Sequence, residues 1–370
     1  MDNSRLHRLS ELRQSVWIDS ISREWLRNGF LRKLMDEDAV VGVTSNPTIF
    51  QKAIASGDAY DDQMREVLAR TDDPKEIFWA LAVTDIQDAC DVLRPVFDAE
   101  SGRDGYVSLE VDPTLAYERD ATLAEALHLH ELVDRPNLYV KIPATEPGLG
   151  AIEDAIARGK SINVTLIFSL DRYRAVADAY IRGLERLVEA GGDPAPVSSV
   201  ASFFVSRVDT EADRRLEAIG TEEALALRGK LAIANAKLAY RHYLETFAGE
   251  RWQRLEDAGA SPQRCLWAST STKNPAYRDV MYVEELIGPH TVNTMPLETV
   301  EAFQDHGEVR PTLEEGVEDA ERLLADLERV GVDYDDVTDT LEREGVDKFA
   351  ESFEQLLDGV RDKRGELAAA

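Results

Sequence analysis

A regular alternation of short β-rich segments with longer amphipathic stretches constrains the fold of this chain more than any other feature. Eight segments are rich in valine, isoleucine, threonine and aromatic residues, as β-strands are, and they lie at 16–20, 40–46, 106–112, 137–143, 162–168, 199–206, 265–270 and 291–296. Between them, apolar residues recur every three or four positions, which predicts helices at 74–97, 115–132, 150–158, 170–189 and 222–247.

This order of elements predicts one closed sheet. No Asn-Gly or Asp-Gly turn joins two strands directly, so we expect successive strands to run parallel and to close into a (β/α)8 TIM barrel, an α/β fold. A doubly wound open sheet is the competing architecture. Additional helices are predicted before the first strand, after the second and after the eighth, where 312–360 has the pattern of several consecutive helices.

The chain is expected to form a single domain over residues 1–370, because no low-complexity linker divides it. Residues 308–370 hold twenty acidic against eight basic side chains, a pattern typical of a solvated helical face. We therefore interpret 308–370 as an acidic helical extension at the C-terminus that packs on the barrel.

Composition and net charge limit the kinds of ligand and macromolecule that this protein can bind. Of the 370 residues, 44% are hydrophobic, which is enough for a large core. The 71 acidic residues outnumber the 42 basic ones and give a formal charge of −29, so the surface is expected to repel nucleic acid and anionic membranes. A phosphorylated small molecule stays compatible with this charge where a few cations gather locally.

Other residue types exclude further functions. Cys90 and Cys265 form no disulfide framework, and no apolar run approaches the ~20 residues of a membrane span, so we expect a cytoplasmic protein. The histidines are scattered, and the run Gly-Leu-Gly at 148–150 lacks the third glycine of a dinucleotide-binding loop. We predict no metal and no cofactor. A monomer and a homodimer are both compatible with the sequence.

Alternation along the predicted strands places polar side chains on the barrel axis. Successive side chains of a strand point in turn to the surrounding helices and to the axis. In 106–112, Val107 and Leu109 form the apolar face, which leaves Glu110 on the axis side. The other strands give a similar inward set near their carboxyl ends, where barrel active sites lie. The whole set is Asp19, Asn46, Glu110, Lys141, Asn163, Thr165 and Ser202.

Lys141 is the most informative of these residues. It lies between Val140 and Ile142, and a lysine in the middle of an apolar strand is seldom buried without a partner or a task. A neutral amine attacks a carbonyl carbon to form a Schiff base, and burial favours that neutral form. The alternative is a structural ion pair with Glu110 or Asp19. With two carboxylates available to move protons, the set fits class I aldol chemistry.

Six segments of the chain resemble the transaldolases, in the order that this family shows. They are GVTSNPTIF at 42–50, VSLEVDPTLA at 107–116, LYVKIPAT at 138–145, INVTLIFS at 162–169, ASFFVSRVD at 201–209 and the run at 266–295. The combination of Thr-Ser-Asn-Pro, a later Glu-Val-Asp and a lysine strand is specific. The length and the WASTSTKNP segment are similar to the longer bacterial branch of the family.

The resemblance implies a role for each inward residue. Lys141 would form the Schiff base with the dihydroxyacetone unit of a ketose phosphate, and Asp19 would move the proton of the C4 hydroxyl. Glu110 would shuttle protons through a water held partly by Thr165. The dihydroxyacetone part would be bound by Asn46, Asn163 and Ser202.

Phosphate recognition is implied for Arg207 and, after the seventh strand, for Ser271 and Lys273. Many members of the family carry arginine where this chain has Lys273, and lysine lacks the planar fork that binds phosphate through two hydrogen bonds. A solvated loop lysine is the alternative for Lys273. For Arg207, the alternative is a salt bridge to Asp209 or to a helix acid.

The resemblance therefore predicts a transaldolase, a transferase of the non-oxidative pentose phosphate pathway. It would move a dihydroxyacetone unit between sedoheptulose 7-phosphate/glyceraldehyde 3-phosphate and erythrose 4-phosphate/fructose 6-phosphate. A fructose-6-phosphate aldolase or another class I aldolase is the alternative, but such aldolases are usually shorter and tend to have tyrosine where this chain has Phe204. A catalytically silent barrel acting as a binding protein is the remaining alternative, and the joint presence of Asp19, Glu110 and Lys141 speaks against it.

Overall fold

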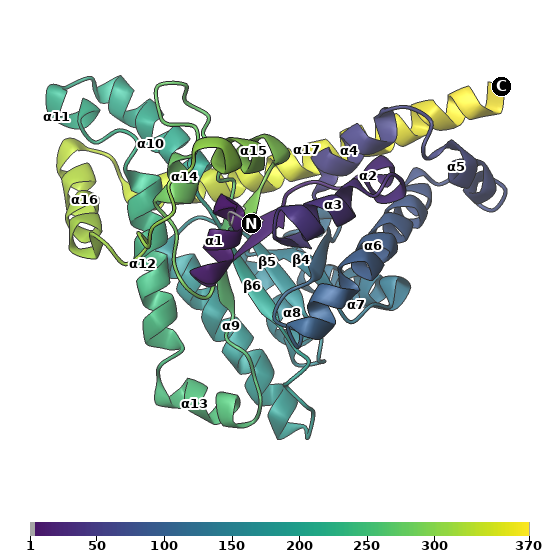
Figure 1. Ribbon diagram of the computed structural model, residues 1–370, viewed down its shortest axis with the longest axis horizontal. Coiled ribbons are helices and arrows are strands. Elements are labelled where there is room, and N and C mark those ends of the chain that lie inside the picture. The colour runs from purple at the N-terminus through teal and green to yellow at the C-terminus, as the bar shows by residue number, and fades with distance from the viewer. Residues whose placement is uncertain (1–3, 370) are drawn as a thin grey trace.

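The computed structural model describes residues 4–369 and contains a closed barrel of eight parallel strands (Figure 1). The strands are β1 (Gln14–Ile18), β2 (Val40–Val43), β3 (Tyr106–Glu110), β4 (Leu138–Pro143), β5 (Ile162–Ile167), β6 (Ser199–Phe204), β7 (Arg264–Ala268) and β8 (Thr291–Met295). Each strand pairs with the next, and β1 pairs with β8 along its whole length, which closes the sheet. The predicted barrel is confirmed, and the open doubly wound sheet is excluded.

The predicted strands differ from the observed ones mainly at their carboxyl ends. The prediction extends the second strand to Asn46 and the third to Asp112, because these polar residues continue the alternation. In the structure both residues begin helical turns instead. The Asn46 side chain accepts a hydrogen bond from the backbone N–H of Ile49, and Asp112 accepts one from Thr114. Asp112 also forms an ion pair with Lys75 at 2.6 Å, so it lies away from the barrel axis.

Aromatic side chains fill the amino-terminal half of the barrel axis. Tyr106 and Tyr139 stack with their ring centroids 4.0 Å apart, and Trp17 stacks on Tyr139 at 6.0 Å. Gly42 of β2 makes room for the indole, because a Cβ at this position would collide with the Trp17 ring. Since this end is packed, the open space of the barrel is at the carboxyl ends of the strands.

Helices connect the strands and cover the outside of the barrel (Figure 1). They are α2 (Arg23–Arg27), α3 (Phe30–Glu37), α6 (Pro74–Ala99), α7 (Arg119–Val133), α8 (Glu146–Ile156), α9 (Leu170–Glu189), α10 (Ser206–Ile219), α11 (Glu222–Leu225), α12 (Leu231–Thr246), α13 (Glu250–Asp257), α14 (Met281–Glu284) and α15 (Leu297–His306). The α9 helix has the predicted bounds, and Ser169 caps it by accepting a hydrogen bond from the N–H of Arg172. Within residues 4–369, no helix is long and apolar enough to cross a membrane.

Three helix predictions need correction. The helix predicted at 115–132 is a 3-10 turn, η1 (Pro113–Leu115), followed by α7. The helix predicted at 222–247 is divided into α11 and α12, because Gly229 between them has a φ of 69°, a left-handed conformation that ends a helix. The helix predicted at 150–158 begins earlier, at Glu146, because Thr145 caps it by accepting a hydrogen bond from Gly148.

Additional helices lie at all three predicted places. They are α1 (Arg5–Glu11) before β1, α4 (Pro47–Ala55) and α5 (Asp61–Leu68) after β2, and α16 (Val317–Val330) and α17 (Tyr334–Ala369) after β8. The long α17 helix, yellow in Figure 1, packs on α4, α6 and α10. A stripe of buried apolar residues makes these contacts, among them Leu341, Phe349, Phe353 and Val360. The acidic C-terminal segment is thus helical and lies against the barrel.

Candidate active site

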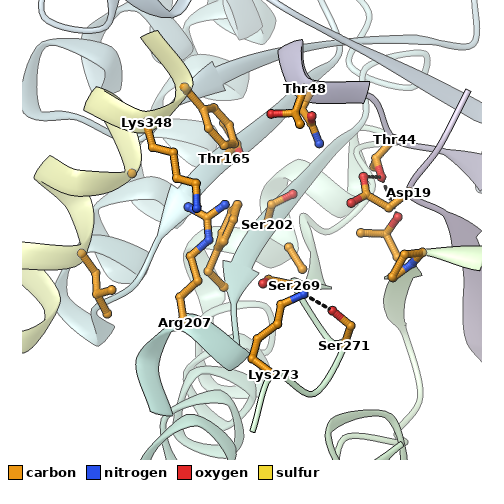
Figure 2. A pocket seen from close by; sticks show the side chains of 18 of the residues that line it. Asp19, Thr44, Thr48, Thr165, Ser202, Arg207, Ser269, Ser271, Lys273 and Lys348 are labelled. Carbon is orange, nitrogen blue, oxygen red and sulfur yellow. Dashed lines mark hydrogen bonds between the residues drawn. The ribbon is translucent and has the colours of Figure 1, made fainter. Parts of the chain in front are cut away.

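A cavity of about 850 Å³ opens at the carboxyl ends of the strands. It is the place where the alternation along the strands predicts the polar residues to meet (Figure 2). Eight of the ten predicted site residues line it, and these are Asp19, Asn46, Lys141, Thr165, Ser202, Arg207, Ser271 and Lys273. The other two, Glu110 and Asn163, are buried next to the lining residues.

Lys141 and Glu110 face each other across two neighbouring strands. They are register partners on β4 and β3, and Lys141 Nζ lies 3.3 Å from Glu110 Oε2. The ammonium also donates a hydrogen bond of 2.9 Å to the backbone carbonyl of Ser45. Burial raises the pKa of Glu110, and the charge of Lys141 opposes that rise. A carboxyl whose pKa is raised holds its proton more readily than an ordinary one, which suits a group that both accepts and returns protons.

Asp19 follows the end of β1 on the other side of the cavity. Its carboxylate accepts a hydrogen bond of 2.6 Å from Thr44 Oγ1, and Thr44 in turn lies 2.6 Å from Thr294 Oγ1 on β8. Burial raises the pKa of Asp19, while the Thr44 hydrogen bond and the charges of Lys141 and Arg207 work in the opposite direction. Asp19, half-buried at the cavity wall, is therefore a second carboxyl suited to proton transfer, and Thr44 and Thr294 hold it in place.

Thr165 and Glu110 present buried polar atoms without hydrogen-bond partners. Within residues 4–369, neither Thr165 Oγ1 nor Glu110 Oε1 forms a hydrogen bond. Buried polar groups are normally paired, so such atoms need an explanation. At the edge of an open cavity, they can bind a water molecule or an oxygen atom of a ligand.

Ser202 and Asn163 form a hydrogen-bonded chain across the barrel. Ser202 Oγ donates to Asn163 Oδ1 at 2.6 Å, and Asn163 Nδ2 donates to Ser108 Oγ at 3.1 Å. Ser202 lines the cavity, whereas Asn163 is fully buried beside it and holds the serine. Asn46 lines the cavity as well, and it caps α4 at the same time.

Arg207 is a half-buried cation near the start of α10. Within residues 4–369 it forms no ion pair, and its guanidinium lies 4.9 Å from the ring centroid of Phe204 and 5.6 Å from that of Phe349. Asp209 accepts hydrogen bonds from Tyr282 Oη and the N–H of Ala232, so a salt bridge between Asp209 and Arg207 is excluded. Burial lowers the pKa of Arg207 from its ordinary value. Its charge is directed to the cavity.

Lys273 and Ser271 lie on the loop after β7. Lys273 Nζ donates a hydrogen bond of 2.5 Å to Ser271 Oγ, as the dashed line in Figure 2 shows. Ser269, which also lines the cavity, has a φ of 57° and turns the chain at the strand end. Lys273 is an exposed loop lysine, as the alternative interpretation has it, but it also belongs to the cavity wall.

Sequence reasoning missed residues that come from α17. Lys348, Phe349 and Gly345 of this helix line the cavity, and so does Lys52 of α4. The Phe349 ring centroid is 5.9 Å from Lys141 Nζ. A signal was present in the sequence, because Lys348 is one of eight bases against twenty acids in residues 308–370 and adjoins an apolar stripe. That signal does not say which cavity the helix covers.

A metal site needs several ligand side chains close together. Among residues 4–369, no group of three or more histidine, cysteine, aspartate or glutamate side chains is arranged to hold a metal ion. Lys141 and Arg207, two cations, dominate the charge around Glu110.

Comparisons with known proteins identify related chains. The family model described as Transaldolase/Fructose-6-phosphate aldolase matches residues 16–360. The chain is 56% identical over 362 residues to a transaldolase of Parafrankia sp. (strain EAN1pec), covering 98% of both chains. It is 56% identical over 358 residues to a transaldolase of Thermobifida fusca, covering 96% of this chain and 97% of the relative. It is 52% identical over 365 residues to a transaldolase of Mycolicibacterium paratuberculosis, covering 98% of both.

Proposed function

The chain belongs to the transaldolase/fructose-6-phosphate aldolase family, and we propose that it is a transaldolase that forms a Schiff base through Lys141. The reaction transfers dihydroxyacetone between sedoheptulose 7-phosphate/glyceraldehyde 3-phosphate and erythrose 4-phosphate/fructose 6-phosphate, in the non-oxidative pentose phosphate pathway. The single observation that carries the proposal is the buried amine of Lys141 in a cavity with two separate carboxyl groups, Glu110 and Asp19.

The first stage joins Lys141 to the ketose phosphate. Lys141 must lose a proton before its nitrogen can attack the C2 carbonyl, and Glu110 at 3.3 Å can accept that proton. Attack forms a carbinolamine, which loses its hydroxyl as water and leaves an iminium ion. Thr165 Oγ1, which is buried and without a partner among residues 4–369, suits the water that carries protons between Glu110 and the substrate.

The second stage breaks and remakes a carbon–carbon bond. Asp19 takes the proton of the C4 hydroxyl, the bond between C3 and C4 breaks, and its electron pair passes into the iminium to give an enamine. The aldose phosphate leaves. The enamine carbon then attacks the carbonyl carbon of the acceptor, and Asp19 returns the proton to the new hydroxyl. Thr44, which donates to Asp19 at 2.6 Å, keeps the carboxylate oriented for both transfers.

Cations along the cavity wall suit the phosphate group of each sugar. Arg207 has no ion pair within the described part of the chain, and Lys273 with Ser271 lies on the loop after β7. Because the chain carries a charge of −29, an anionic substrate meets a repelling field outside the cavity. The local cations must therefore supply the attraction.

A fructose-6-phosphate aldolase is the second candidate, because the family description includes it. Two observations favour transfer: the relatives are named transaldolases, and Phe204 lines the cavity where the shorter aldolases tend to have tyrosine. A phenylalanine cannot bind a water through a hydroxyl.

The assay that separates the two functions supplies fructose 6-phosphate with and without erythrose 4-phosphate. A transaldolase makes sedoheptulose 7-phosphate only when the acceptor is present, and it releases little free dihydroxyacetone. Release of dihydroxyacetone at the same rate without acceptor would identify an aldolase. No consumption under either condition would overturn both functions and leave the silent binding barrel.

We also propose that the described elements form one domain and that the protein acts in the cytoplasm. The packing of α17 on α4, α6 and α10 supports a single unit. Cys90 and Cys265 are both buried and free, as in a reducing compartment. Limited proteolysis tests the first statement: a stable fragment that lacks 308–370 and keeps full activity would contradict it.

A further inference from the structure

Lys348 lies on α17, a helix of the cavity wall that has no role in the proposed mechanism. Tyr334, at the start of α17, donates a hydrogen bond to Asn235 Oδ1 at 2.6 Å and accepts one from the N–H of Leu170 at 3.0 Å. Eleven residues later, Gly345 packs so closely on β5 that a Cβ would lie 3.1 Å from Leu166 Cδ2. These contacts fix the height and rotation of α17. The position of Lys348 over the cavity is therefore built into the fold.

The β5 strand adapts to this contact. Leu166 has a φ of 59°, and the pairing of β5 with β6 shifts its register between Val164 and Ile167. Positive φ is unfavourable for a leucine, so the surrounding structure must hold it there. The bulge turns Leu166 toward Gly345. The carboxyl end of the barrel and α17 are thus fitted to each other directly above the catalytic strands.

Lys348 has carboxylates within reach of its own helix and pairs with none of them. Glu344 and Glu351 lie four residues before and three residues after it, the spacings at which helix ion pairs form. Among residues 4–369, however, no ion pair or hydrogen bond of Lys348 is present, although several other bases of the molecule pair at such spacings, Arg361 with Asp358 among them. In Figure 2, the Lys348 side chain extends from α17 into the cavity toward Arg207.

Two cations that point toward each other repel unless an anion lies between them. Phe349, the residue after Lys348, has its ring centroid 5.6 Å from the Arg207 guanidinium, so α17 contacts Arg207 at this point. Arg207 has no ion pair within the described residues either. Lys273 reaches the same cavity from a third element, the loop after β7. Arg207, Lys273 and Lys348, none of which has an ion pair among residues 4–369, therefore line a space that suits a doubly charged anion.

We propose that Lys348 binds the phosphate group of the sugar phosphates, together with Arg207 and Lys273. The inference rests on the proposed transaldolase function and adds a substrate-binding residue to it. The loop cation is a lysine, which acts as a single point charge and not as a fork. A phosphate monoester carries close to two negative charges at neutral pH, so a further point charge from α17 compensates for the missing fork.

The role proposed for Lys348 also gives the acidic C-terminal segment a function. Residues 308–370 carry a strong negative charge, and yet one of their few bases faces the cavity. Lys348 is exposed at the cavity wall, so an approaching phosphate can reach it as it enters the cavity. The surrounding acids then repel anions that bind elsewhere on the helix.

The test compares Lys348→Gln with Arg343→Gln as a matched control. Arg343 is an exposed base on the same helix and does not line the cavity, so both variants remove one charge from α17. We expect Lys348→Gln to raise the KM for fructose 6-phosphate roughly ten-fold with kcat within about two-fold, the loss expected for one charge-assisted contact. Arg343→Gln should match the wild type, and Lys348→Arg should restore most of the affinity.

A direct binding measurement keeps the inference separate from the proposed function. Inorganic phosphate titrated into each protein, followed by 31P NMR, should bind the wild type and Arg343→Gln equally and Lys348→Gln more weakly. Equal phosphate binding and equal KM in both glutamine variants would overturn the role of Lys348 while leaving transaldolase activity intact. A wild type that makes no sedoheptulose 7-phosphate would overturn the proposed function, and the phosphate titration would still decide whether Lys348 binds the anion.

Discussion

The two ends of the barrel interior differ in how many hydrogen-bond and ion-pair partners their charged side chains have. At the amino end, the guanidinium of Arg264 donates hydrogen bonds to Asp104 at 3.1 Å, to Ser15 Oγ at 2.8 Å and to the carbonyl of Arg103 at 2.6 Å. Asp104 also accepts from Trp17 Nε1 at 3.0 Å and from Ser15 Oγ at 2.7 Å. Both carboxylate oxygens of Asp104 and both terminal nitrogens of Arg264 therefore have hydrogen-bond partners.

At the carboxyl end, the buried charges have fewer partners. Lys141 lies 3.3 Å from Glu110, one carboxylate oxygen of Glu110 and the hydroxyl of Thr165 lack hydrogen bonds among residues 4–369, and Arg207 has no ion pair there. Unpaired buried polar groups cost free energy of folding. The difference teaches that burial of a charge is by itself ambiguous. The charges at the amino end stabilise the barrel, whereas those at the carboxyl end are available to bind a ligand.

Lys141→Met should have the largest effect on activity, and it tests whether the charges at the carboxyl end serve catalysis. Removal of the amine removes the Schiff base, so transfer activity should fall by about 10⁴-fold or more. The barrel should still fold, because Glu110, whose pKa burial already raises, can take up a proton when its counter-charge is gone. Circular dichroism and the transfer assay measure the two quantities. A variant that fails to fold would show that Lys141 has a structural role.

Arg264→Met should have the opposite effect. It removes the buried partner of Asp104 and leaves only the half-exposed Arg103, 3.9 Å from the carboxylate, which should lower the free energy of unfolding by about 3–5 kcal/mol. Because Arg264 lies at the far end of the barrel, kcat/KM of the folded protein should stay within about two-fold of the wild type. Urea unfolding and kinetics at low temperature test both. A large loss of kcat/KM with unchanged stability would break the contrast between the two ends.

Glu110→Gln tests the proton acceptor without changing side-chain size. We expect kcat to fall roughly 10²-fold, the usual contribution of one positioned acid–base group. Glu110 must be ionised to accept a proton, and burial raises its pKa. The wild-type rate should therefore rise with pH through a pKa above the ordinary carboxyl range, and this limb of the profile should be absent from the variant. A variant with the same pH profile as the wild type would remove Glu110 from the mechanism.

Asp209→Asn tests how a buried carboxyl outside the cavity affects the stability of the protein as pH changes. Burial raises the pKa of Asp209 to about 7, and its two hydrogen-bond donors, Tyr282 and the N–H of Ala232, only partly oppose this. The folded protein thus holds a proton that the unfolded chain releases near pH 4. Stability should fall as pH rises from about 5 to 8, by on the order of 1–3 kcal/mol relative to Asp209→Asn.

Urea unfolding at a series of pH values measures this difference. The free energy of unfolding of the wild type should decline more steeply with pH than that of Asp209→Asn, which has no proton to lose at this position. Parallel curves for the two proteins would contradict the raised pKa. Activity is not expected to follow the same curve, since Asp209 does not line the cavity.

Sequence alone predicts the barrel and the inward polar residues of its strands, because both depend on local periodicity. The two-residue period of β4 and β5 is sufficient to place Lys141 and Thr165 on the axis. It does not show how far below the cavity surface an inward side chain lies. Asn163 is therefore predicted as a ligand contact but is observed buried behind Ser202. Alternation gives the face of a strand, while depth depends on the stagger of neighbouring strands.

The contribution of α17 could not be predicted for a different reason. Lys348 and Phe349 are about two hundred residues from Lys141 in the sequence, and no local pattern relates them. Their place depends on contacts between distant elements, such as the hydrogen bond of Tyr334 with Asn235 and the fit of Gly345 on β5. The acidic and helical character of the extension is a prediction from composition and periodicity, whereas the place of α17 on the cavity wall depends on the three-dimensional fold.

Borohydride reduction in the presence of fructose 6-phosphate tests the central claim most directly. If the Schiff base forms at the carboxyl end of the barrel, where the charged side chains have few partners, reduction should fix a three-carbon adduct on the peptide that contains Lys141. The same treatment should abolish activity. Lys141→Met, treated in the same way, should remain unlabelled. An adduct on any other lysine, or no adduct in an active wild-type protein, would contradict the account.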